Sequence, residues 1–347
     1  MALPEIFHKG IRRGKHWRNL AGIQLRRVRE GLTDPRSRLL PGTSDYELHS
    51  RKEREHYSEM YAGDPSLLFE PEPPTWMEVE RRTESLVREA TGNDITGHVL
   101  SRLTGRPGVR MLSLGSGPGG VELMLAGEAP ECRITCIDFN ENLLALGRTR
   151  AREQGLALEF QKADLNNVSL PEGEFDLIFC HASLHHVVNL EDLAAEIRKT
   201  LRPGGALIVV DVIARTGYRM WPETRRVVET LWATLPARYR VNHTAYGERR
   251  LDRRIWDGGT DHEGMECIRS GDLVGILESN FERVFFASCH GLSRRFFNTM
   301  YGWNYDLAQP LDRAILDWIW ELDCRMVSSG KLRGESMFGV YAPRQNQ

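Results

Sequence analysis

The chain has 347 residues, of which 41% are hydrophobic and 27% are charged, as in ordinary globular proteins. Its net charge of −2 gives no overall attraction to a polyanion such as nucleic acid. The sequence has no apolar run long enough for a membrane-spanning helix, and its first residues lack the charged and apolar regions of a signal peptide. The six cysteines are scattered and form no Cys-x-x-Cys pair. We therefore expect a cytoplasmic protein with reduced thiols and no metal site.

The first 40 residues are strongly basic. They hold ten Lys or Arg against three Asp or Glu, which is a balance of +7. We interpret this segment as a solvated helix face or as an arm docked on the acidic remainder of the chain. Nucleic acid, anionic lipid and an acidic surface are the alternative partners. The sequence leaves open whether the chain forms a homodimer.

The middle of the chain alternates between short apolar strands and helices. Helices are expected first at 51–62 and 76–103, the second with an interruption at Gly92-Asn93. Strands are then predicted at 109–114, 133–138, 157–161, 175–180 and 206–213. The helices between them are predicted at 119–127, 141–153 and 190–201. This alternation is typical of an α/β fold with a doubly wound, mostly parallel sheet.

The last part of the chain departs from this alternation. Residues 214–280 are charged and aromatic, and six of the eight tryptophans follow residue 211. We interpret this segment as a cap whose aromatic residues build a ligand pocket, a small core of their own, or both. A helix at 310–328 between strands at 281–288 and 336–342 predicts an antiparallel hairpin that completes a seven-stranded sheet. We therefore divide the chain into a helical lead-in and lid (1–104), a core (105–213), the cap (214–280) and a core-completing segment (281–347).

A glycine-rich loop follows the first predicted core strand. It reads Gly115-Ser116-Gly117-Pro118-Gly119-Gly120, and Asp138 ends the next strand 19 residues after Gly119. Glycines let the backbone turn tightly and approach a ligand, and a carboxylate at a strand tip can accept both hydroxyls of a ribose. The pattern predicts a nucleoside-containing cofactor at the carboxyl ends of parallel strands. A tight turn without a ligand and a dinucleotide-binding loop also fit the glycines alone.

Four motifs follow one another through the core. They are Leu114-Gly115-Ser116-Gly117-Pro118-Gly119-Gly120; Ile137-Asp138-Phe139-Asn140; Lys162-Ala163-Asp164-Leu165; and Phe175-Asp176-Leu177-Ile178 with Leu184-His185-His186-Val187 and Leu201-Arg202-Pro203-Gly204-Gly205. In this order they resemble the motifs of the class I S-adenosylmethionine-dependent methyltransferases, in the group with a Leu-His-His segment. The resemblance covers 105–213 and, more weakly, 281–342. It implies a Rossmann-like fold, and the late hairpin disfavours the alternative of a nicotinamide-dependent oxidoreductase.

The resemblance implies S-adenosyl-L-methionine as the cofactor and S-adenosyl-L-homocysteine as the product. It puts the glycine loop beside the methionine part, Asp138 on the ribose, Phe139 on the adenine ring and Asp164 on the adenine amino group. The helix at 51–62 looks like the lid helix of such enzymes. The cofactor-binding residues expected from this likeness are Tyr57, Tyr61, Gly115, Ser116, Gly117, Asp138, Phe139, Asp164, Leu165, Cys180 and His181.

One position departs from the family pattern. The family usually has an acidic residue two positions before the first glycine, and this chain has Ser113 there. Serine supplies no negative charge for the ammonium group of the methionine part. Glu122 is the candidate substitute, and a carboxylate on the outer surface of its helix is the alternative interpretation.

Methyl transfer from a sulfonium is an in-line displacement with a neutral leaving group. The protein therefore aligns the reactants and excludes water, and it needs a general base only when the acceptor must lose a proton. The histidine candidates for that role are His181, His185, His243 and His262, each with a purely structural role as the alternative. Arg294-Arg295 would receive an anionic or sugar-like acceptor, or form surface salt bridges.

These residues favour a methyltransferase that acts on a small organic acceptor, by O-methylation of a natural product or sugar-like compound. An RNA or protein methyltransferase that uses the basic segment is the alternative within the same chemistry. A non-catalytic subunit that binds an adenosine ligand is the alternative outside it, and Ser113 favours that interpretation.

Overall fold

The computed structural model describes residues 39–62, 72–105, 107–244, 249–259 and 264–344. The basic segment lies almost wholly outside these ranges, and so does His262. Within them, no helix combines the length and the apolar character that crossing a bilayer requires.

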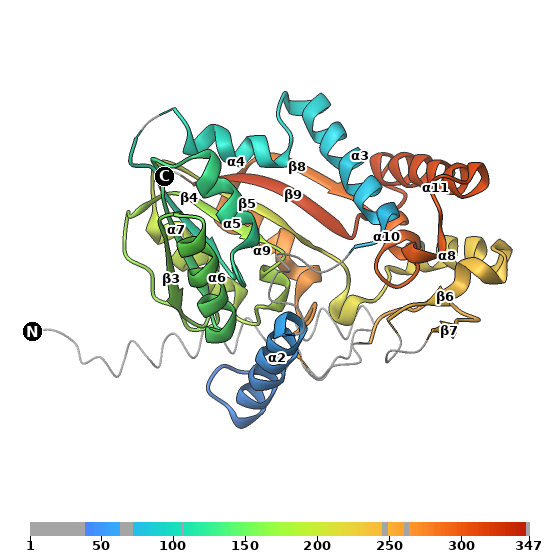
Figure 1. Ribbon diagram of the computed structural model, residues 1–347, viewed down its shortest axis with the longest axis horizontal. Coiled ribbons are helices and arrows are strands. Elements are labelled where there is room, and N and C mark those ends of the chain that lie inside the picture. The colour runs from blue at the N-terminus through green and yellow to red at the C-terminus, as the bar shows by residue number, and fades with distance from the viewer. Residues whose placement is uncertain (1–38, 63–71, 106, 245–248, 260–263, 345–347) are drawn as a thin grey trace, which may run out of the picture.

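One seven-stranded sheet forms the centre of the fold, in the order β3-β2-β1-β4-β5-β9-β8 (Figure 1). Its first five strands are parallel, and β9 runs antiparallel to both β5 and β8. The predicted parallel sheet and late antiparallel hairpin are therefore confirmed. The strand bounds are β1 Arg110–Leu114, β2 Arg133–Asp138, β3 Leu158–Lys162, β4 Phe175–His181, β5 Leu201–Val212, β8 Phe281–Cys289 and β9 Ser336–Pro343.

The helices lie where polar caps and prolines allow them to begin. Asp94 accepts a hydrogen bond from Gly97 N at 2.7 Å and starts α4, after Gly92 has ended α3 in a left-handed conformation. The predicted interruption at Gly92-Asn93 is thus confirmed. The helix bounds are α2 Ser44–Ala62, α3 Pro74–Thr91, α4 Ile95–Leu103, α5 Gly120–Glu128, α6 Glu141–Glu153, α7 Leu190–Thr200, α8 Pro222–Thr234, α9 Leu273–Asn280, α10 Ser293–Phe297 and α11 Pro310–Ser328.

Each face of the sheet has its own hydrophobic core, because successive strand residues point to opposite sides. Leu112 and Leu114 of β1 pack in the core that includes α7 and α9, whereas Met111 packs in the core that includes α4, α5 and α6. The central strands β1, β2 and β4 are therefore buried on both faces, as the doubly wound prediction requires, whereas the edge strands β3 and β8 are largely exposed or partly buried.

A third core joins the cap to helices from the lead-in and from the last part of the chain. It combines buried side chains of α3, α8, α10 and α11, among them Trp76, Trp232, Phe296 and Leu316. In Figure 1 these helices gather beside the β8–β9 edge of the sheet. The cap also contains two short strands, β6 Val241–Asn242 and β7 Arg250–Leu251, that the sequence did not predict. Aromatic residues of the cap such as Trp232 and Tyr239 are therefore buried in a core that the cap shares with α3, α10 and α11.

Trp232→Ala is expected to lower the free energy of unfolding by about 3–5 kcal/mol, because it opens a cavity in the cap core. The indole ring is 2% exposed, and its centroid lies 4.8 Å from that of Tyr301. Urea unfolding followed by circular dichroism measures the change. Trp318→Ala is the matched control, because that indole is 56% exposed and its removal should change stability little. Equal effects of the two substitutions would contradict this account of the cap.

Candidate functional site

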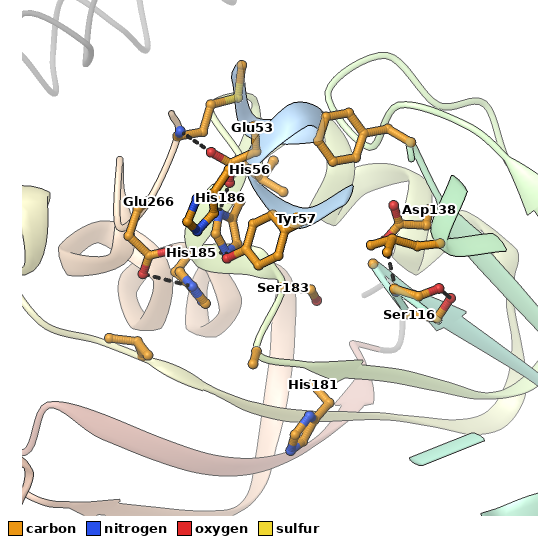
Figure 2. A pocket seen from close by; sticks show the side chains of 18 of the residues that line it. Glu53, His56, Tyr57, Ser116, Asp138, His181, Ser183, His185, His186 and Glu266 are labelled. Atoms are coloured by element: carbon orange, nitrogen blue, oxygen red, sulfur yellow. Dashed lines mark hydrogen bonds and ion pairs between the residues drawn. The ribbon is translucent and has the colours of Figure 1, made fainter. Parts of the chain in front are cut away.

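A cavity of about 900 Å³ lies at the carboxyl ends of the parallel strands, where the strand order reverses between β1 and β4. Helix α2, the glycine loop, the segment after β4 and parts of the cap line it. Figure 2 shows Asp138 and Ser116 on one side of this cavity, and His185, His186, Glu53 and Glu266 together on the other. The residues proposed from sequence that line it are Tyr57, Tyr61, Gly115, Ser116, Gly117, Asp138, Phe139, Asp164, Leu165, His181 and His185.

The glycine loop wraps around the carboxylate of Asp138. Gly117 N donates to Asp138 Oδ2 at 2.9 Å, and Asn140 N donates to Oδ1 at 2.8 Å. Burial raises the pKa of Asp138, and these backbone donors oppose that effect. Each carboxylate oxygen keeps a further lone pair, so Asp138 can still accept two hydroxyl groups from a ligand.

Position 115 requires glycine for two reasons, its backbone conformation and the closeness of the Ser183 side chain. Its φ of +72° lies in the left-handed region, and an added Cβ would stand 2.5 Å from Cβ of Ser183. The loop can therefore pass between β2 and the segment after β4 only with glycine at this position.

Ser113 and Glu122 form a buried pair behind the glycine loop. Ser113 Oγ donates to Glu122 Oε1 at 2.6 Å, and the two residues are 1% and 2% exposed. Glu122 also lines the cavity, so the interpretation of a carboxylate on the helix surface is wrong. Burial raises the pKa of Glu122, and a cation beside it would favour the ionised form.

Helix α2 contributes one face to the cavity. Tyr46 OH donates to Asp164 Oδ2 at 2.6 Å, and the Arg54 guanidinium lies 5.6 Å from the Phe139 ring centroid. Burial, and then the charge of Asp164, raise the pKa of Tyr46. The helix therefore covers the two residues that the family resemblance puts beside adenine.

Two histidines occupy the opposite wall. Nδ1 of His185 lies 2.5 Å from Asp211 Oδ1, and its Nε2 lies 3.3 Å from Glu266 Oε1. Nδ1 of His186 lies 2.5 Å from Glu53 Oε1, and its Nε2 lies 3.4 Å from Glu266 Oε2. Although desolvation disfavours the imidazolium, Asp211 and Glu266 raise the pKa of His185 to about 10. A histidine that already carries this proton cannot serve as a general base at neutral pH.

His181 stands apart from this pair. It ends β4 and lines the cavity, where it is exposed and lies apart from the other labelled side chains (Figure 2). Desolvation lowers the pKa of His181, so the ring is neutral near pH 7 and can accept a proton. Of the histidine candidates that line the cavity, His181 is thus the one suited to base chemistry.

Two other sequence candidates among the described residues are not brought to the cavity. Cys180 packs in the sheet core, because neighbouring strand residues face opposite sides and His181 faces the cavity. The expectation that Cys180 faces the cofactor is therefore wrong. His243 interacts with Asn304 Oδ1 at 2.9 Å and does not line the cavity, and His262 lies outside the described residues.

The cap side of the cavity is aromatic. The Arg294 guanidinium lies 5.4 Å from the Trp76 ring centroid and 5.0 Å from that of Tyr218, and all three line the cavity. Arg295 instead forms a buried ion pair with Glu335 at 2.7 Å. Arg294 therefore faces the cavity, as a residue that receives an acceptor would, whereas Arg295 has a structural role in a salt bridge.

Sequence reasoning missed Tyr46, Glu53, Asp211 and Glu266. One signal was available, because Tyr46, Glu53 and Tyr57 are spaced by 7 and 4 residues and so share a helix face. Glu266 had no local signal, since it reaches the cavity from the cap.

Comparisons with known proteins agree with this geometry. Residues 112–209 match the family model described as a methyltransferase domain. The demethylmenaquinone methyltransferase of Thermus thermophilus is 32% identical over 102 residues, which are 29% of this chain and 46% of the relative. The malonyl-[acyl-carrier protein] O-methyltransferase of Enterobacter lignolyticus is 30% identical over 116 residues, which are 33% of this chain and 44% of the relative. The chain thus spans less than half the length of these curated relatives.

Solved structures are similar at low identity. A putative sarcosine dimethylglycine methyltransferase from Galdieria sulphuraria aligns with a TM-score of 0.46 at 13% identity, over 83% of this chain and 97% of that one. The [4+2]-cyclase SpnF aligns with a TM-score of 0.44 at 20% identity, over 72% and 80%. Residues 112–209, which match the methyltransferase-domain model, contain three of the five parallel strands and most of the other two, and they resemble a class I S-adenosylmethionine-dependent methyltransferase domain.

Gly115→Ala is expected to cost at least about 1–2 kcal/mol of stability, because it forces a Cβ into a left-handed backbone and against Ser183. Thermal and urea unfolding measure this loss. Gly127→Ala is the matched control, since this exposed helical glycine meets nothing within 4 Å and the change should be neutral or slightly stabilising. An equally benign Gly115→Ala would contradict the close packing inferred for the loop.

Proposed function

We propose that this protein is an S-adenosylmethionine-dependent methyltransferase that acts on a small organic acceptor inside the cavity. The observation that carries the proposal is the cradle formed by the glycine loop and Asp138 at the β1–β4 switch point of a methyltransferase domain. The cavity is bounded by α2 and the aromatic cap, which favours a small acceptor over a polymer.

The residues present fit S-adenosylmethionine. Asp138 retains acceptor capacity for two ribose hydroxyls, and the glycine loop exposes backbone without side chains in the way. Phe139 offers an apolar ring to adenine, and Asp164 offers its carboxylate to the adenine amino group beside Leu165. Tyr57 and Tyr61 of α2 border the same space. When bound, the cofactor supplies an electrophilic methyl group on a sulfonium.

Glu122 replaces the acidic residue that the family usually has at the position of Ser113. Its buried carboxylate is oriented by Ser113 Oγ and faces the cavity behind the glycine loop. We expect it to pair with the ammonium group of the methionine part, because an opposite charge stabilises a buried carboxylate.

The acceptor atom proposed is a hydroxyl oxygen. A hydroxyl must lose its proton as it is methylated, and the base we propose is His181, which lines the cavity and whose pKa desolvation lowers. Natural products and sugar-like compounds with hydroxyl groups are therefore the first acceptors to screen with a labelled methyl donor. Cofactor binding without turnover across a broad screen would instead favour the non-catalytic subunit.

Asp138→Ala is expected to weaken binding of S-adenosylhomocysteine at least about tenfold, because hydrogen bonds to a charged group contribute about 1.5–3 kcal/mol each. Calorimetric titration measures the Kd. Glu159→Gln on the exposed side of β3 is the control and should leave the Kd unchanged. An Asp138→Ala protein that binds as tightly as the wild type would rule out the proposed ribose site.

Glu122→Gln tests the ammonium site separately. The substitution keeps the shape but removes the charge, so the Kd for S-adenosylhomocysteine should rise about tenfold. Binding of 5′-methylthioadenosine should not change, because this compound lacks the amino-acid part. The two Kd values, measured by competition, distinguish loss of an ion pair from general damage to the loop. Equal weakening for both ligands would contradict the role assigned to Glu122.

A further inference from the structure

Four potential metal ligands converge on the cavity wall opposite Asp138. His185 and His186 belong to the turn after β4, and Glu266 and Cys267 belong to the cap. One ligand atom each from His185, Glu266 and Cys267 lies within 4.8 Å of the others. Figure 2 shows both imidazoles turned toward Glu266, well away from Ser116 and Asp138. The cluster therefore lies on the opposite wall of the same cavity from Asp138, with His186 Nε2 3.5 Å from Tyr57 OH.

In both histidines a carboxylate contacts Nδ1, which is the usual arrangement around a metal-binding imidazole. Nδ1 of each ring lies 2.5 Å from a carboxylate oxygen, of Asp211 in one case and Glu53 in the other. Asp211 is itself fixed by hydrogen bonds from Leu184 N and Val212 N, both at 2.7 Å. A carboxylate on Nδ1 fixes the ring, and Nε2, which faces Glu266 in both histidines, can become a ligand atom once a metal ion displaces its proton.

The distances between ligand atoms suit a small divalent ion. The two Nε2 atoms lie 3.3 and 3.4 Å from the two oxygens of Glu266, and Cys267 Sγ lies 3.4 Å from Oε1. Two ligand atoms bound at about 2.0–2.1 Å to a tetrahedral zinc ion are roughly 3.3–3.4 Å apart. Nitrogen, oxygen and sulfur ligands together are typical of zinc and of the borderline metals near it.

Charge and backbone geometry also fit a cation at this place. Glu53, Asp211 and Glu266 bring three negative charges to two imidazoles in the interior, and two ring protons or one divalent ion would each lower that charge from −3 to −1. Cys267 is fully buried with a φ of +49°, a strained conformation for a residue other than glycine. Such strain is commonly retained at functional sites.

We propose that His185, Glu266 and Cys267 bind a divalent transition-metal ion of the zinc class, with His186 beside Glu266 as a neighbouring imidazole. The sequence predicted no metal site, because its cysteines lack paired spacing and the ligands come from distant segments. Since both histidines and Glu266 line the cavity, the ion would face the space offered to the acceptor. The competing explanation is that no metal ion binds, and that both imidazoles are protonated and form ion pairs with the surrounding carboxylates.

The test is a titration of tag-free protein, stripped with chelator, with Co²⁺ and then Zn²⁺. The expected result is saturation at one ion per chain, visible absorption of tetrahedral Co²⁺, a thiolate-to-cobalt charge-transfer band, and displacement by Zn²⁺. Failure of the wild-type protein to bind either ion at one per chain would overturn the proposal. The readout needs no cofactor and no acceptor, so its failure is distinguishable from failure of the methyltransferase proposal.

Variants assign the ligands. Glu266→Gln should weaken Co²⁺ binding at least about tenfold, and Cys267→Ser should remove the charge-transfer band while leaving weaker binding. His98→Gln is the matched control, because this imidazole lies on α4 beside Phe285 and Phe338 and should not affect binding. Circular dichroism confirms that each variant is folded. Binding that is identical in wild type, Glu266→Gln and Cys267→Ser would contradict the assigned ligand set.

Discussion

A buried network of charges joins the lid, the core and the cap. Glu53 of α2, the two imidazoles after β4, Asp211 of β5 and Glu266 of the cap all meet within ion-pair distance. Charged groups in a protein interior must be paired, so these segments cannot separate without exposing an unbalanced charge. The same segments form the walls of the cavity. Its shape therefore depends on this network, whether protons or a metal ion complete it.

The sheet and its helices were largely predictable, because their signals are local. α6 and α11 begin and end where the sequence predicts, since Asn140 caps the first and Pro310 occupies the first turn of the second. β5 begins at Leu201 rather than at residue 206, because the Pro203-Gly204 turn is absorbed into a strand with a register shift against β4. The cap was not predictable in detail, because its core combines helices distant in sequence.

In the candidate site, too, the residues with local sequence signals were predictable and those that depend on long-range packing were not. The glycine loop and Asp138 lie at a strand end with local motifs, and they come together as predicted. The burial of Glu122 could not be predicted from the sequence, because only the packing shows that its carboxylate lies against Ser113. Glu266 could not have been found, since it depends on how the cap folds back over the turn after β4. Sequence thus predicted the wall formed by the glycine loop and Asp138 far better than the wall formed by the turn after β4 and the cap.

The most direct test of the central claim is a crystal structure of the full chain with S-adenosylhomocysteine. The account predicts the ligand in the cavity, with both ribose hydroxyls on Asp138, the ammonium group at Glu122 and adenine beside Phe139. A ligand bound elsewhere, or one whose ribose does not contact Asp138, would contradict the assignment of this cavity as a methyl-donor site.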